Sequence, residues 1–143
     1  MIPEASQFSF WHTVEVRFKD IDVGGHVHHS VALVYFEEAR ARYWHDVVGR
    51  GSLEDVDFIL AEARVRYHAR VGYPLRLRVG VRIPKRGKKH FVMEYLALDE
   101  AGEPLVSGET VLVMYDYETG KTKGIPPEVR EAMEGHEEGG LVG

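Results

Sequence analysis

Aliphatic residues occupy every second position of one continuous stretch of this chain, from residue 75 to residue 83. They are Leu75, Leu77, Val79, Val81 and Ile83, and between them stand Arg76, Arg78, Gly80 and Arg82. Because successive side chains of a strand point to opposite faces, this spacing places the aliphatic residues on one face and the arginines on the other. The pattern therefore predicts a half-buried strand.

Less regular alternation of the same kind recurs in residues 14–18, 59–67, 91–97 and 111–117. Sequences typical of turns separate the last three predicted strands, at residues 85–88 and 99–102, and another follows the last strand at residues 118–120. Short turns join antiparallel neighbours, so the last four strands are predicted to form an antiparallel meander.

A long helix is predicted between the first and second strands. Ser30 can cap its start, because a serine hydroxyl can accept a hydrogen bond from a first-turn N–H, and Gly49 and Gly51 can end it. Its apolar residues are spaced as one wide helical stripe, made of Ala32, Leu33, Val34, Tyr35, Phe36, Ala39, Tyr43, Trp44 and Val47. With a short helix after Pro126 and Pro127, the element order predicts an α+β domain in which a curved antiparallel sheet wraps around the long helix.

Length and composition limit the other possibilities. One domain is expected over residues 1–134, and residues 135–143, rich in Gly and Glu, are expected to be disordered. The absence of cysteine excludes disulfides and thiolate catalysis. A net charge of −5 argues against a general nucleic-acid binder. No apolar stretch approaches the ~18 residues of a membrane span, and residues 1–11 do not resemble a secretory signal. We therefore expect a cytoplasmic protein without membrane or nucleic-acid partners, and the lack of Asn points to a heat-adapted source.

The segment from Arg17 to Ser30 carries the chemistry of this sequence. Its fourteen residues include Asp20, Asp22, Gly24, Gly25, His26, His28 and His29. They lead into a helix start, where unpaired N–H groups can stabilise an oxyanion while a nearby carboxylate attacks a carbonyl or activates water. This combination favours acyl or carbonyl chemistry. A metal site built from the three histidines is the disfavoured alternative, because no Cys and no His-Glu-x-x-His motif accompanies them.

Several motifs together resemble the 4-hydroxybenzoyl-CoA thioesterase-like branch of the hotdog-fold thioesterases. The resemblance runs from about Thr13 to Tyr117. It lies in Val16-Arg17-Phe18, in Asp20-x-Asp22-x-x-Gly25-x-Val27 with His29, in Tyr35-Phe36-Glu37-x-Ala39-Arg40, and in Arg86-Gly87 followed by Phe91 and Tyr95.

The resemblance implies a five-stranded antiparallel sheet curled around the helix, and homodimers, often homotetramers, with active sites at the dimer interface. It also implies hydrolysis of acyl-CoA thioesters without a metal or a cofactor beyond the coenzyme A of the substrate. Asp22 would be the nucleophile or general base, and His29 would polarise the carbonyl through its N–H. Gly25, His28 and Ser30 would position the substrate around that N–H.

Four cations stand close together at Lys85, Arg86, Lys88 and Lys89. Arg86, Lys88 and Lys89 can bind the phosphates of coenzyme A, or the group can be a charged hairpin tip that keeps sheet edges from aggregating. Two other functions stay open, a hotdog protein that binds acyl-CoA without hydrolysis and a hotdog enoyl hydratase or dehydratase. The sequence does not indicate the acyl group.

Overall fold

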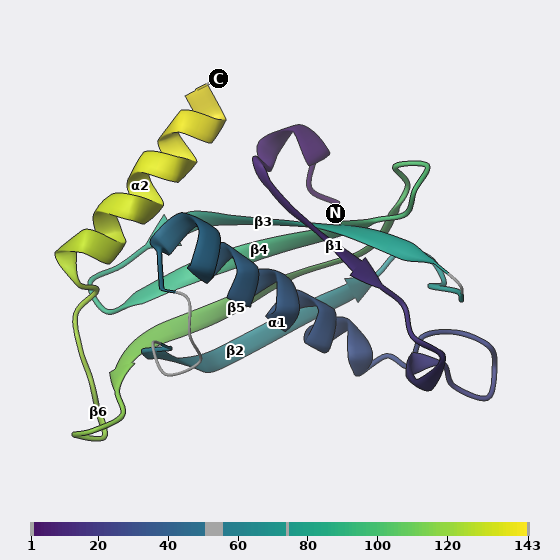
Figure 1. Ribbon diagram of the computed structural model, residues 1–143, viewed down its shortest axis with the longest axis horizontal. Coiled ribbons are helices and arrows are strands. Elements are labelled where there is room, and N and C mark those ends of the chain that lie inside the picture. Colours follow the sequence, from purple (N-terminus) through teal and green to yellow (C-terminus); the bar gives the residue numbers. More distant parts are fainter. Residues whose placement is uncertain (1, 51–55, 74, 143) are drawn as a thin grey trace.

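The structure is a computed structural model that describes residues 2–50, 56–73 and 75–142 (Figure 1). Its strands are β1 (Phe10–Glu15), β2 (Phe58–Tyr67), β3 (Arg76–Arg86), β4 (His90–Leu98), β5 (Pro104–Asp116) and the short β6 (Lys121–Thr122). The sheet order is β1-β3-β4-β5-β2, with β6 paired to β5, and every pairing is antiparallel. The predicted meander is confirmed for β3, β4 and β5. It is wrong for β2, which pairs with β5 rather than with β3 and lies at one edge of the five-stranded sheet.

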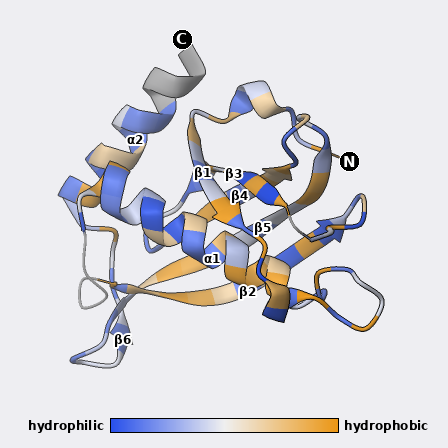
Figure 2. Ribbon diagram, turned by 45° about the vertical axis from the view of Figure 1, so that its right-hand side comes forward, coloured by the Kyte–Doolittle hydropathy of each residue, from blue (hydrophilic) through white to orange (hydrophobic). Residues whose placement is uncertain are grey.

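The long helix α1 (Val31–Tyr43) lies across the concave face of the sheet and continues as a π-helical turn, Trp44–Val48, which ends at Gly49 with φ of +81°. Gly49 therefore ends the helix as predicted, whereas Gly51 lies outside the described residues. The aliphatic face of β3 is buried under α1, as the alternating pattern requires: Leu77, Val79, Val81 and Ile83 are at most 1% exposed. Figure 2 shows hydrophobic strands beneath α1 and hydrophilic residues on the outer sides of α1 and α2.

Close packing joins α1 to the middle of the sheet. The Phe36 ring stacks on the Tyr95 ring with centroids 4.6 Å apart. Gly108 on β5 permits this approach, because a Cβ there would lie 2.8 Å from the Phe36 ring and 2.5 Å from the Arg64 carbonyl oxygen. The arrangement is the hotdog fold, an α+β architecture in which one curved five-stranded antiparallel sheet wraps around one long helix.

The first predicted strand is displaced. β1 ends at Glu15, and Phe18, expected to be its last inward residue, lies in a 3-10 turn (Phe18–Asp20) with 78% of its surface exposed. The cause is local: the Asp20 carboxylate accepts the Arg17 N–H at 3.0 Å, and this bond closes the turn.

Residues 135–142, which the sequence predicts to be disordered, belong in the structure to helix α2 (Pro127–Val142). Val129 and Met133 anchor its first half in the core, and the buried Glu137 carboxylate accepts the Ile83 N–H. That N–H lies within a register shift between β3 and β4, which interrupts the strand pairing there. No helix among the described residues is long and apolar enough to cross a membrane.

Candidate active site

The loop between β1 and α1 is anchored by Asp20. This residue is buried, and its carboxylate accepts hydrogen bonds from the Tyr35 hydroxyl at 2.6 Å and from the Arg17 N–H. Its backbone carbonyl accepts the His28 N–H at 2.8 Å. Burial and the bond to Asp20 raise the pKa of Tyr35, so its hydroxyl remains a donor at neutral pH. Asp20 therefore holds the loop against the start of α1.

Asp22 lies in a tight turn within this loop. One carboxylate oxygen, Oδ1, accepts the N–H groups of Gly24 at 2.9 Å and His26 at 3.2 Å, and the Asp22 N–H donates to the His26 carbonyl. Gly25 occupies the turn with φ of +81°, a conformation that favours glycine. The hydrogen bond from the His26 N–H, with the Gly24 N–H and the nearby histidines, holds the pKa of Asp22 below its ordinary value of 3.8.

The other carboxylate oxygen of Asp22 is available for chemistry. Oδ2 accepts no hydrogen bond from any described residue, and the side chain is partly exposed. Because the pKa is lowered, the carboxylate is ionised at neutral pH. Asp22 thus presents one charged oxygen outward while the other holds the turn.

The start of α1 is capped by His28 rather than by Ser30. Ser30 stands at the predicted cap position, but its backbone is helical, with φ of −72° and ψ of −21°, and its hydroxyl makes no cap bond. Hydroxyl caps ordinarily need an extended backbone at this position. The Ser30 hydroxyl lies 2.8 Å from His28 Nδ1, and the Ser30 N–H donates to that same nitrogen at 3.2 Å.

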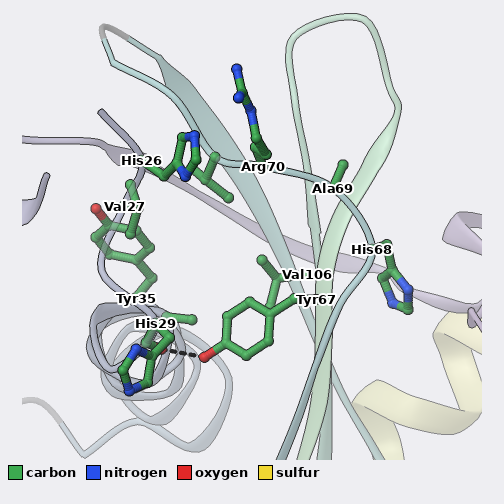
Figure 3. Close-up of a pocket in the computed structure, with 11 residues that line it drawn as sticks. His26, Val27, His29, Tyr35, Tyr67, His68, Ala69, Arg70 and Val106 are labelled. Carbon is green, nitrogen blue, oxygen red and sulfur yellow. Dashed lines mark hydrogen bonds between the residues drawn. The ribbon is translucent and has the colours of Figure 1, made fainter. Parts of the chain in front are cut away.

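A pocket of about 340 Å³ opens beside this helix start (Figure 3). Its wall combines apolar side chains with a polar rim: His26, Val27, His29, Ala32, Tyr35, Tyr67, His68, Ala69, Arg70, Val71 and Val106. The bond from the Val27 N–H to the Val71 carbonyl, at 2.8 Å, holds the two sides together. The His29 N–H finds no acceptor among the described residues. Asp22 is not part of the wall, but the next turn residues, His26 and Val27, are.

Of the predicted set, His29 lines the pocket, whereas Asp22 and Gly25 lie in the turn that leads to it and His28 and Ser30 lie at the start of α1. The structure also adds Tyr67 and Arg70, which sequence analysis did not single out. Both stand in a segment without a motif, and they reach the pocket only because a long-range backbone bond brings residues 68–73 to the loop.

The predicted cations Arg86, Lys88 and Lys89 do not join this site within one chain. Arg86 is the last residue of β3, and Lys88 and Lys89 follow it, at the end of the strand opposite to the pocket. Eleven residues of extended strand span roughly 35 Å. Arg86 lies 3.7 Å from Glu134 of α2 and donates to the Ile83 carbonyl, and Lys89 donates to Thr122.

The three histidines of the loop do not form a metal centre with the other residues that the structure describes. No group of three or more His, Cys, Asp or Glu side chains suited to a metal ion occurs there. The rings of His28 and His29 stack on each other instead, with centroids 4.3 Å apart.

The chain is similar to a thioesterase family model and to solved structures of thioesterases. The family model described as the thioesterase-like superfamily matches residues 16–133. The uncharacterized protein YsmA of Bacillus subtilis is 28% identical over 128 residues, which are 90% of this chain and 87% of YsmA. A thioesterase of Thermus thermophilus, solved in complex with coenzyme A and Zn, is 33% identical with a TM-score of 0.82, over 92% of this chain and 96% of that one. A predicted thioesterase from Bacillus stearothermophilus has the same fold, with a TM-score of 0.82 at 20% identity over 89% of this chain and 95% of that one.

Proposed function

Because the chain belongs to the thioesterase-like superfamily, whose enzymes hydrolyse thioesters, we propose that it hydrolyses acyl-CoA thioesters to a free acid and coenzyme A, with Asp22 and the His29 N–H as the reacting groups. The complex of the 33% identical Thermus protein with coenzyme A supports this substrate class. The observation that carries the proposal is that His29, whose N–H finds no acceptor among the described residues, lines a pocket next to the turn that holds the ionised Asp22 carboxylate.

In the proposed reaction the thioester carbonyl accepts the His29 N–H, which stabilises the negative charge that develops on its oxygen. Asp22 Oδ2 then attacks the carbonyl carbon, the carbon–sulfur bond breaks, and coenzyme A leaves as thiolate. Water hydrolyses the resulting anhydride to the free acid and regenerates the carboxylate. Alternatively, Asp22 takes a proton from a water molecule that attacks the same carbon. Both routes need the ionised carboxylate, and neither needs a metal ion or a cofactor.

We also propose that the working unit is a homodimer paired through β2, the unit from which a tetramer would be built. β2 is one of the two edge strands of the sheet, and residues 60–64 are exposed on both of its faces. The unpaired side of an edge strand of this length is a ready template for another strand. Isologous antiparallel pairing of two β2 strands places the Tyr67 end of one beside the Phe58 end of the other.

This pairing would complete the site with cations from the second chain. The Tyr67 end of β2 lies at the pocket, and the Phe58 end pairs with Met114, whose N–H donates to the Lys89 carbonyl at 2.8 Å. The hairpin with Lys88 and Lys89 is therefore about two strand spacings, roughly 10 Å, from the Phe58 end. In the dimer these cations approach the pocket of the other subunit, where they can bind the phosphates of coenzyme A.

A thiol-release screen tests the proposal. The purified protein is given short-chain, long-chain and aromatic acyl-CoAs, and free coenzyme A is measured against a reaction without protein. We expect release above background for at least one class, and the preferred class identifies the acyl group. Saturable binding of acyl-CoA without thiol release would show a noncatalytic binder and overturn the proposal.

A further inference from the structure

We propose that Tyr67 and His28 are positioning residues that hold the His29–Ser30 peptide from its two ends and so aim the His29 N–H into the pocket. This inference rests on the proposed function for its catalytic meaning. Its structural content is independent of the reaction, because it concerns which groups immobilise one turn of backbone.

Tyr67 holds the carbonyl end of this peptide. It is the last residue of β2, and its hydroxyl donates a hydrogen bond to the His29 carbonyl oxygen. Its ring forms part of the pocket wall, and Figure 3 shows the hydroxyl directed at the backbone of His29. Partial burial raises the pKa of Tyr67, which keeps the hydroxyl protonated as a donor at neutral pH.

His28 holds the amide end of the same peptide. The N–H that follows the His29 carbonyl belongs to Ser30, and it donates to His28 Nδ1. Because Nδ1 accepts, the neutral imidazole carries its proton on Nε2. One peptide group is thus bound by a side chain from the sheet at its oxygen and by a side chain from the loop at its nitrogen.

The preceding peptide, which joins His28 to His29, is held as well. The His28 carbonyl accepts the Val31 N–H at 2.9 Å, and the His29 N–H is the one without an acceptor among the described residues. The hydrogen bond from Val31 to His28 spans the His29–Ser30 peptide, so immobilising that peptide also helps to hold the preceding peptide. A donor that is already aimed before the substrate binds stabilises an oxyanion better than a donor that must reorient.

Two tyrosines of this chain make a matched comparison. The Tyr117 hydroxyl donates to the Phe58 carbonyl at 2.8 Å, the same kind of bond at the opposite end of β2. Tyr67→Phe and Tyr117→Phe each remove one partly exposed hydroxyl and keep the ring. We expect Tyr67→Phe to lower kcat about 10- to 100-fold with KM changed by less than about twofold, the effect of a small misplacement of a reacting group. Tyr117→Phe should keep wild-type kinetics.

We call the two contacts of Tyr67 and His28 with the His29–Ser30 peptide the clamp. The contact of His28 has its own test. His28→Asn keeps a side-chain acceptor for the Ser30 N–H, whereas His28→Phe keeps a ring that can stack on His29 but has no acceptor. We expect His28→Phe to lower kcat like Tyr67→Phe and His28→Asn to recover most of the loss.

Hydrogen exchange of the Ser30 amide separates failure of this inference from failure of the proposed function. In Tyr67→Phe and His28→Phe the Ser30 amide should exchange faster than in the wild type, and in Tyr117→Phe at the wild-type rate. A wild-type protein that hydrolyses no thioester would overturn the proposed function, yet the exchange rates would still test the clamp. Tyr67→Phe that matches Tyr117→Phe in both exchange and kcat would overturn the clamp itself.

Discussion

Asp22 makes the same local contacts as two other aspartates of this chain. Asp99 Oδ1 accepts the N–H groups of Ala101 and Glu103, both at 2.9 Å. Asp116 Oδ1 accepts those of Glu118 at 2.9 Å and Thr119 at 3.3 Å. All three are turns closed by an aspartate side chain. What distinguishes Asp22 is its place: its turn is packed against the start of α1 and provides part of a pocket wall.

The Asp22 carboxyl group should titrate below its ordinary pKa. The pKa is lowered in the folded state, chiefly by the His26 N–H, so the ionised carboxylate stabilises the turn above pH 3.8, and this contribution is lost as pH falls through the lower, folded value. We expect the Asp22 carboxyl carbon, followed by NMR and assigned with Asp22→Asn, to titrate with a midpoint below 3.8. The reaction should then show no Asp22 limb between about pH 5 and 8. A midpoint above 5 would contradict the geometry and indicate a desolvated general base.

At the scale of elements, the contact between α1 and β5 depends on the missing side chain of Gly108. A Cβ there would collide with the Phe36 ring and with the Arg64 carbonyl of the neighbouring strand. Neither backbone nor stacked ring can move away easily, so Gly108→Ala should lower the free energy of unfolding by about 1–3 kcal/mol. Gly135 in α2 is the control, because nothing lies within 4 Å of an added Cβ and Gly135→Ala should stabilise the helix by about 0.5–1 kcal/mol. Denaturant unfolding measures both, and equal effects would contradict this account of the packing.

The strands and α1 could be predicted because their signals are local. The alternating aliphatic residues of the segment 75–83 are buried in the structure as predicted, because one continuous face of β3 contacts α1. The order of α2 beyond residue 134 could not be predicted, because it depends on Glu137 reaching an N–H that a register shift leaves unpaired more than fifty residues earlier. Likewise, Asp22 and His29 were found through their motif, whereas Tyr67 and Arg70 become site residues only through long-range pairing.

At the scale of the whole molecule, the proposed dimer through β2 would explain both the exposed edge of that strand and the distance of the cationic hairpin from the pocket. In a dimer paired through β2, each site takes Asp22 from one chain and Lys88 and Lys89 from the other. The assembly would then be part of the active site. Dimer formation through β2 therefore predicts that two differently inactivated chains can restore each other.

Coexpression of two variants tests this prediction. One chain carries Asp22→Asn, and the other carries Lys88→Glu with Lys89→Glu. Random pairing makes half of the dimers mixed, and each mixed dimer has one intact site, so about a quarter of the wild-type activity should return at low substrate concentration. Cations that acted within their own chain would give no recovery, and light scattering should report at least twice the 16.3 kDa chain mass in every sample.

The most direct test of the central claim compares Asp22→Asn with Asp116→Asn. Both substitutions are nearly isosteric and replace an exposed turn carboxylate whose pKa is lowered by backbone N–H groups, so their effects on folding should be alike. On the preferred acyl-CoA, Asp22→Asn should lower kcat by about 10²–10⁴-fold, the range for loss of an acid–base group, and Asp116→Asn should leave it unchanged. Wild-type hydrolysis by Asp22→Asn would contradict the assignment of Asp22 as the reacting carboxylate.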